Sequence, residues 1–254
     1  IILIRNPRSK INNSFSFFAF AVALRSFAYF FWQISTTYNN ALFWSRILMA
    51  FAIFIPAFYM HFVFALLGIL KEKKNLLLLT HTIFFIFFAI NATTPYFVSG
   101  VRPLLGFRFW PEACFFFHPF LIIWLSYVVY ATHLLYTTQK NSVGLKKMQT
   151  KYILLGMIIG FVGGSTNYFL WYSIPIAPLG NILVSIYVAM TAYAIVKHRL
   201  FDIRLIVARA VAYTILVLLL GALYSAGLFV VGTIFIGAST TSGQLVTSTI
   251  LALA

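Results

Sequence analysis

The chain has 254 residues, of which 62% are hydrophobic and only 8% are Asp, Glu, Lys or Arg. This composition leaves too little polar surface to coat a water-soluble globule, and it predicts a protein whose solvent is lipid. The excess of 18 Lys and Arg over 3 Asp and Glu is typical of nucleic-acid-binding proteins. Here, however, the cations lie in short clusters between long apolar runs, so no nucleic-acid partner is expected.

The predicted elements are apolar runs close to the roughly 20 residues that a helix needs to cross a bilayer. Seven complete runs meet this length: 14–35, 41–70, 75–91, 113–137, 151–172, 176–196 and 208–236. Residues 1–4 and 244–254 resemble parts of two further spans, so the chain is expected to be truncated at both ends. The runs lack an alternating apolar and polar period, which disfavours membrane strands. The predicted fold is all-α: a polytopic transmembrane helix bundle with seven complete spans and a partial span at each end.

The charges predict how the bundle is oriented. If the N-terminal cluster is cytoplasmic, fourteen of the 18 basic residues fall on the cytoplasmic side, namely Arg5, Arg8, Lys10, Lys71, Lys73, Lys74, Lys140, Lys146, Lys147, Lys151, Lys197, Arg199, Arg204 and Arg209. Only Arg102 and Arg108 then lie in an outer loop, while Arg25 and Arg46 lie within spans. Membrane insertion favours this topology over its reverse.

Aromatic residues mark the outer ends of the predicted spans. Trp32, Trp44, Trp110 and Trp171 fall there, and Trp124 lies deep. The favoured interpretation is an aromatic belt at the membrane interface. The alternative is a ligand pocket formed by four candidate residues, Trp44, Arg46, Trp110 and Glu112, beside the proline-containing loop 93–112. Arg46 would then bind a carboxylate or a phosphate with two hydrogen bonds.

Few ionisable residues lie within the spans, and each is costly there. Arg25 is expected to face the bundle interior or to extend toward the interface, with carbonyls or polar groups such as Gln33 as partners. Histidines 61, 81 and 133 could form a metal or haem site, and whether they converge is open. The favoured interpretation is that each is satisfied separately, so neither a metal nor a cofactor is predicted.

The three acidic residues, Glu72, Glu112 and Asp202, all lie in predicted loops. No carboxylate relay crosses the membrane, which disfavours a proton- or sodium-coupled carrier. The sequence contains no nucleophile motif and no phosphate-binding glycine loop, so no catalytic residue is predicted. A single cysteine, Cys114, excludes an intrachain disulfide.

Gly156, Gly160 and Gly164 recur every four residues along one predicted helix. Such a face lets a neighbouring backbone approach closely. Gly163 is expected on a different face, where a larger side chain should matter less.

The ordered motifs of the chain resemble the N-terminal seven-helix sensor region of bacterial sensor histidine kinases. In the first half these motifs are residues 5–9 (RNPRS), 41–46 (ALFWSR), 55–56 and 61–62. In the second half they are residues 149–164, the turn containing Pro175, Pro178 and Gly180, and residues 192–203 (AYAIVKHRLFDI). The resemblance implies a sensor region at 1–203, and an additional helix pair at 204–254 that leads to a cytoplasmic output domain missing from the chain.

The implied function is a multi-pass input module in a bacterial cytoplasmic membrane. A small-molecule or membrane signal would change helix packing, and the protein's own kinase domain would read the change. A homodimer is possible, and the lipid bilayer is the other expected partner. The same region also occurs on diguanylate cyclases, so the output enzyme stays open. His198 lies at a membrane exit and is not expected to be the phosphorylated histidine. The alternative to a sensor is a transporter or channel, disfavoured by the missing acids and repeats.

Overall fold

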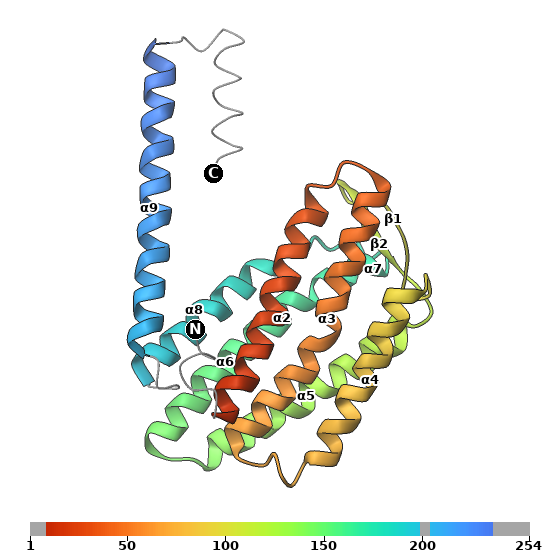
Figure 1. Ribbon diagram of the computed structural model, residues 1–254, viewed down its shortest axis with the longest axis vertical. Coiled ribbons are helices and arrows are strands. Elements are labelled where there is room, and N and C mark those ends of the chain that lie inside the picture. Colours follow the sequence, from red (N-terminus) through yellow and green to blue (C-terminus); the bar gives the residue numbers. More distant parts are fainter. Residues whose placement is uncertain (1–8, 199–203, 236–254) are drawn as a thin grey trace. The chain divides into compact units, whose positions relative to one another are not determined.

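The computed structural model describes residues 9–198 and 204–235 (Figure 1). The chain divides into two compact units, Ile1–Ile203 and Arg204–Ala254. The first unit contains α2 (Lys10–Gln33), α3 (Tyr38–Leu67), α4 (Lys74–Thr93), β1 (Val98–Leu104), β2 (Phe107–Ala113), α5 (Phe117–Asn141), α6 (Gly144–Ser165), α7 (Asn167–Trp171) and α8 (Asn181–His198). The second unit contains α9 (Arg204–Phe235), a helix whose described side chains include many exposed leucines.

The described chain is mostly helical, and each of the seven predicted runs overlaps a described helix. Five helical segments are long and apolar enough to cross a membrane: Lys10–Gln33, Tyr38–Leu67, Lys74–Thr93, Phe117–Asn141 and Gly144–Trp171. Two apolar helices are shorter, Asn181–Ile195 and Val211–Gly227. The expectation of seven complete spans is therefore not confirmed. The two predicted partial spans, 1–4 and 244–254, lie outside the described residues.

The predicted loop 93–112 contains an antiparallel hairpin, so the all-α expectation is wrong for this segment. Strands β1 and β2 pair with Arg102 opposite Trp110. The turn residues Leu105 and Gly106 both have positive φ, 48° and 81°, as a tight hairpin turn requires. Prolines are tolerated in both strands because each strand has only one neighbour in the sheet.

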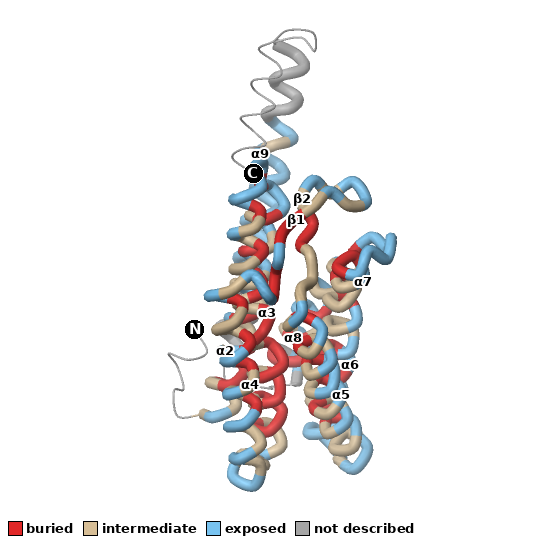
Figure 2. Tube along the Cα trace, turned by 90° about the vertical axis from the view of Figure 1, so that its right-hand side faces the viewer, coloured by how far each residue is buried: buried red, intermediate tan, exposed pale blue. Residues whose placement is uncertain are grey.

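Helix α3 is the central element of the first unit. It contacts α2, α4, α5 and both strands, and Figure 2 shows buried residues concentrated along it. Its sequence is apolar on all sides, as expected for a helix with neighbours all around it. Thr37 caps the start by accepting a hydrogen bond from the Asn40 amide, and Gly68 ends the helix in the left-handed conformation (φ 78°). Helices α5, α6 and α8 form the rest of the bundle through α3–α5, α5–α6 and α6–α8 contacts.

The two ends of the first unit differ in charge. The hairpin end carries β1 and β2, whereas the opposite end, which we call the lysine end, carries the α3–α4 and α5–α6 turns (Figure 1). Six lysines lie at or next to these turns: Lys71, Lys73, Lys74, Lys140, Lys146 and Lys147. The only basic residues of the hairpin are Arg102 and Arg108, and it also carries the acidic Glu112. The folded unit thus separates the same charges on which the predicted orientation depends.

Candidate functional site

The hairpin is anchored in the bundle by tryptophans. Trp110 of β2 is fully buried and packs edge-on against Trp32 of α2, with ring centroids 4.9 Å apart. The indole nitrogen of Trp32 donates a hydrogen bond to the Phe109 carbonyl, 2.9 Å away. The indole nitrogen of Trp110 is buried without a hydrogen-bond partner. The hairpin therefore inserts into the end of the helix bundle.

These contacts overturn the predicted aromatic belt for three of its members. Trp32, Trp110 and Trp171 are only 3%, 0% and 6% exposed, so they do not face lipid. Trp171 stacks on Phe117 of α5 with centroids 4.3 Å apart and rings nearly parallel. The tryptophans lie in the interior because the hairpin and α7 fold back onto the helices. The ends of the predicted spans do not indicate this packing, because it depends on residues far apart in the chain.

Arg46 connects three elements at the hairpin end. Its guanidinium donates a hydrogen bond from Nη2 to the Val98 carbonyl of β1, 3.1 Å away. The Asn91 side chain of α4 donates to the backbone carbonyl of Arg46 at 3.0 Å. The Nε atom of Arg46 is buried without a hydrogen-bond partner. Arg46 thus lies between α4 and the hairpin, with part of its donor capacity unused.

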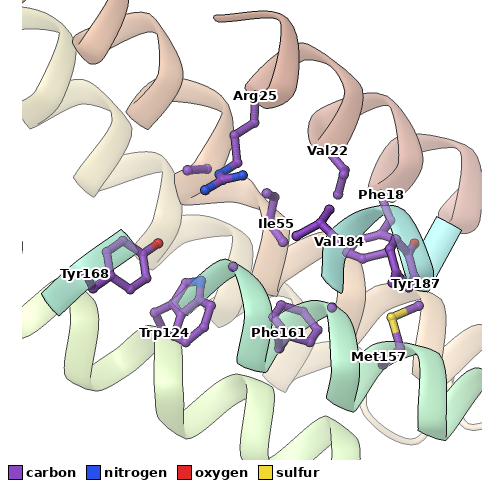
Figure 3. Close-up of a pocket in the computed structure, with 13 residues that line it drawn as sticks. Phe18, Val22, Arg25, Ile55, Trp124, Met157, Phe161, Tyr168, Val184 and Tyr187 are labelled. Atoms are coloured by element: carbon purple, nitrogen blue, oxygen red, sulfur yellow. The ribbon is translucent and has the colours of Figure 1, made fainter. Parts of the chain in front are cut away.

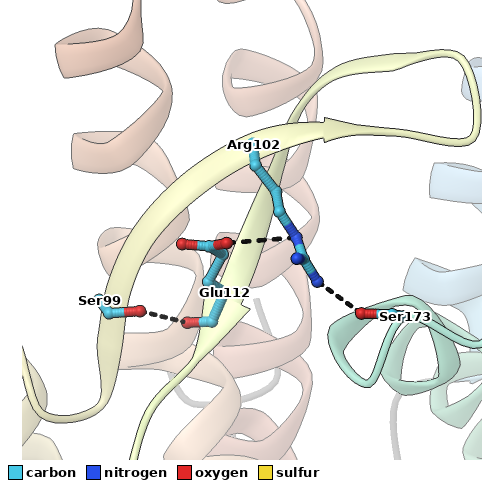
Figure 4. A network of polar contacts seen from close by, with 4 residues as sticks. All are labelled: Ser99, Arg102, Glu112 and Ser173. Atoms are coloured by element: carbon cyan, nitrogen blue, oxygen red, sulfur yellow. Dashed lines mark hydrogen bonds and ion pairs between the residues drawn. The ribbon is translucent and has the colours of Figure 1, made fainter.

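Glu112 belongs to a polar network that joins the hairpin to the segment after α7 (Figure 4). Its Oε1 lies 3.2 Å from Nε of Arg102, an ion pair without aligned hydrogen-bond geometry. Arg102 Nη2 donates to the hydroxyl of Ser173 at 2.6 Å. Ser173 follows α7 and has a positive φ of 60°. Ser99 donates weakly to the Glu112 carbonyl at 3.4 Å.

A second polar contact lies nearby. Tyr172 and Nδ1 of His118 form a hydrogen bond of 2.9 Å. Partial burial raises the pKa of Tyr172 above its ordinary value. This contact ties the residue after α7 to the start of α5.

The four predicted ligand-binding residues occupy separate surroundings. Trp110 is buried against Trp32 of α2, and Glu112 pairs with Arg102. Arg46 binds β1, and Trp44 stacks on Phe31 of α2 with centroids 4.7 Å apart. Among the described residues, no contact brings all four together.

Inside the bundle, the side chain of Arg25 lines a cavity of about 60 Å³ (Figure 3). Arg25 is the only charged residue that lines it. The other lining residues are apolar, aromatic or glycine: Phe18, Val22, Ala52, Ile55, Trp124, Met157, Gly160, Phe161, Gly164, Tyr168, Val184 and Tyr187. In the described part of the chain, no hydrogen bond or ion pair of the guanidinium is seen, neither to Gln33 nor to a carbonyl.

Arg25 also lines a smaller cavity of about 10 Å³ toward the hairpin end, together with Trp110 and Tyr168. Arg25 therefore lies between Trp110 of the hairpin and the main cavity. Sequence reasoning placed Arg25 in mid-span but missed its aromatic neighbours. The glycines of α6 were the one feature of the sequence that indicated space next to Arg25, because Gly160 and Gly164 line the same cavity.

Two asparagines form a buried polar contact next to this region. Asn167 of α7 and Asn181 of α8 exchange amide hydrogen bonds of 2.7 Å and 3.1 Å. Asn181 also donates to the Tyr29 hydroxyl of α2 at 3.0 Å. Sequence reasoning missed this network because isolated asparagines carry no pattern.

The glycines of α6 lie against α8. A Cβ atom on Gly160 would be 2.9 Å from the Tyr187 ring, whereas one on Gly156 or Gly164 would find no heavy atom closer than 3.6 Å. Gly163 was expected on a different face, and this is wrong. A Cβ there would collide with the carbonyl oxygen of Gly180 and lie 2.6 Å from Leu183 of α8. Gly160 and Gly163 both face α8, because the start of α8 crosses close to the end of α6.

The three span histidines do not form one cluster. His61 and His81 have ring centroids 5.6 Å apart, while His133 lines a different cavity between α5 and α6. Within residues 9–198 and 204–235, no group of three His, Cys, Asp or Glu side chains is placed to hold a metal ion.

Comparison with protein families matches residues 1–204 to the family described as the N-terminal 7TM region of histidine kinase. Neither a curated protein nor a solved structure matches the chain.

Proposed function

Because this chain belongs to the family of N-terminal seven-transmembrane regions of histidine kinases, we propose that it is the input module of a two-component sensor kinase in a bacterial inner membrane. The multi-pass helical unit is a membrane sensor module. The family is an N-terminal region and not a catalytic domain, so we assign phosphotransfer to a kinase domain of the same gene product.

One observation supports a sensor in particular: the hairpin is bonded to three separate parts of the bundle. It accepts a hydrogen bond from Trp32 of α2, accepts one from Arg46 of α3, and donates one through Arg102 to Ser173 after α7. A ligand that moves the hairpin would therefore pull on several helix ends at once. Coupling between two sites requires a structural element whose position both sites influence.

We place the external stimulus at the hairpin end, with Arg46 as the anchor. Its guanidinium donates one hydrogen bond to a neutral carbonyl, and its buried Nε atom has no hydrogen-bond partner. An anionic group on a small molecule would be a stronger acceptor than the Val98 carbonyl. In this proposal, binding shifts the hairpin because the ligand competes with the Val98 carbonyl for Arg46.

A phosphorylation assay on the complete gene product, reconstituted into liposomes, tests the assignment as a sensor kinase. We expect ATP-dependent phosphorylation on histidine, and a basal rate at least about twofold different in Trp110→Ala, which removes the buried hairpin anchor. Leu125→Ala is the matched control, since Leu125 is 55% exposed on α5. Formation of a cyclic dinucleotide from GTP, with no histidine phosphorylation, would replace the kinase assignment by a cyclase.

A further inference from the structure

We infer that the cavity around Arg25 binds the anionic head of an amphiphile, such as a fatty-acid carboxylate, which reaches it from the bilayer between α2 and α8. This inference goes beyond the proposed function, because it concerns binding alone and holds whatever output the protein controls.

The charge balance points to an anion. Arg25 lies in the apolar middle of α2, and no acidic residue lines its cavity. Glu112 is at the hairpin and paired with Arg102, and Glu72 is in the turn at the lysine end. A guanidinium keeps its charge inside a membrane protein, and leaving that charge without an anion or hydrogen bonds is costly. A bound carboxylate would supply both.

The walls suit a carboxylate head followed by an apolar chain. Figure 3 shows the Tyr168 hydroxyl and the Trp124 indole on the wall that faces the Arg25 side chain. These groups are donors that an anionic oxygen can accept from. Phe18, Val184 and Phe161 complete the wall with apolar surface. Ligand sites commonly combine such an apolar lining with a few polar groups.

The route to the site lies along one face of α2. Phe18, Val22, Arg25 and Tyr29 recur at helical spacing, and the face meets α8 at two points. Phe18 contacts Tyr187 with centroids 6.2 Å apart, and the Tyr29 hydroxyl accepts from Asn181. Between these points, Val22, Arg25 and Val184 are only half-buried. A membrane-dissolved ligand can therefore approach Arg25 between the two helices.

The volume limits what fits. A cavity of 60 Å³ holds about four to six waters, which corresponds to a carboxylate and a few methylene groups. The remaining chain would extend into the bilayer between α2 and α8, past the half-buried Val22 and Val184. The shared chemistry is an anionic oxygen head on an apolar chain, supplied either by a free fatty acid or by a resident anionic phospholipid. The small volume favours the fatty acid.

Quenching of tryptophan fluorescence tests the proposal in phosphatidylcholine nanodiscs. The probe is a fatty acid that carries a nitroxide near its carboxyl end, and Trp124→Phe identifies the signal from the cavity. We expect saturable quenching, with apparent affinity weakened about tenfold or more in Arg25→Gln, the loss of one charge-assisted contact. The methyl ester of the probe, which has no charge, should quench without saturation. A nitroxide-labelled phosphatidylglycerol tests the resident lipid as the source.

Two further variants guard against loss of folding. Gly164→Leu should fill the cavity, because Gly164 lines it and a Cβ at this residue would lie 4.0 Å from the nearest heavy atom, Val184 Cγ2. It should abolish saturable quenching while Arg25 is intact. Arg108→Gln, on the exposed hairpin, should bind as wild type does. Arg25-dependent quenching by the labelled phospholipid alone would assign the site to resident lipid. Equal quenching in Arg25→Gln, Gly164→Leu and wild type by both probes would overturn the proposal.

Discussion

Gly163 of α6 and Gly180, which precedes α8, pack backbone against backbone. The carbonyl oxygen of Gly180 occupies the space that a Cβ atom of residue 163 would need, and a Cβ on Gly180 would lie 2.8 Å from the carbonyl oxygen of Gly163. A backbone cannot move aside as a side chain can. The contact therefore sets how closely the end of α6 and the start of α8 approach each other.

Gly163→Ala should destabilise the bundle, by about 1–3 kcal/mol, because the added methyl group overpacks a backbone contact. Gly164→Ala is the matched control on the next residue: its Cβ would lie in ordinary contact with Val184, and alanine favours the helix. Thermal unfolding in detergent measures both variants. A Gly164→Ala midpoint as low as that of Gly163→Ala would show that the close approach is not what matters.

Trp32→Phe should loosen the hairpin. The phenylalanine keeps an aromatic ring against Trp110 but cannot donate to the Phe109 carbonyl, a loss of about 1 kcal/mol for a partly buried hydrogen bond. Trp44→Phe serves as the control, because Trp44 stacks on Phe31 but makes no hydrogen bond with the described residues. Thermal midpoints in the same detergent should fall for Trp32→Phe only. If both variants fall equally, ring volume and not the hydrogen bond accounts for the loss.

Arg46→Leu should free β1 from α3. Leucine retains apolar contact but removes the donor to the Val98 carbonyl, so amides of residues 94–104 should exchange with deuterium at least about threefold faster. Hydrogen–deuterium exchange followed by mass spectrometry measures residues 94–104 as one peptide. Arg108→Leu, which removes an exposed cation lying 5.3 Å over the Phe109 ring, should leave that peptide unchanged. Unaltered exchange in Arg46→Leu would remove Arg46 from the coupling proposed between the hairpin and α3.

The ion pair between Arg102 and Glu112 should contribute little to stability. Both side chains are about two-fifths exposed (42% and 37%), and exposed pairs are worth about 0–1 kcal/mol. A double-mutant cycle with Arg102→Gln and Glu112→Gln should give a coupling energy in that range, smaller at high salt. A coupling well above it, insensitive to salt, would mean that the network in Figure 4 is more desolvated than its exposure indicates.

Cysteine labelling tests the predicted orientation. In a Cys114→Ser background, a cysteine at the exposed Ser99 should react with an impermeant maleimide on intact cells, and one at Ser142 only after lysis. The reason is the concentration of lysines at the end that carries Ser142. Labelling of Ser142→Cys from outside, with Ser99→Cys protected, would reverse the topology.

The sequence by itself determined the membrane class, the approximate helix positions and the family. Span length is a property of consecutive residues, because the thickness of the hydrocarbon core decides how many apolar residues must follow one another. The motifs from residues 5–9 to residues 192–203 also depend only on the order of residues in the chain, so the family could be recognised without the structure. The seven predicted runs therefore overlap described helices, although only five helical segments reach the length and hydropathy of a complete span.

Only the tertiary structure decided which way each helix faces and what the loops become. Gly163 faces α8 against expectation, and Trp32 and Trp110 face each other and not lipid. The strands formed within a segment predicted as a loop, because their pairing and their burial on α3 depend on residues far away in the chain. Arg25 is the clearest case: its charge is visible in the sequence, but the cavity beside it exists only where residues of α2, α3, α5, α6, α7 and α8 meet in space.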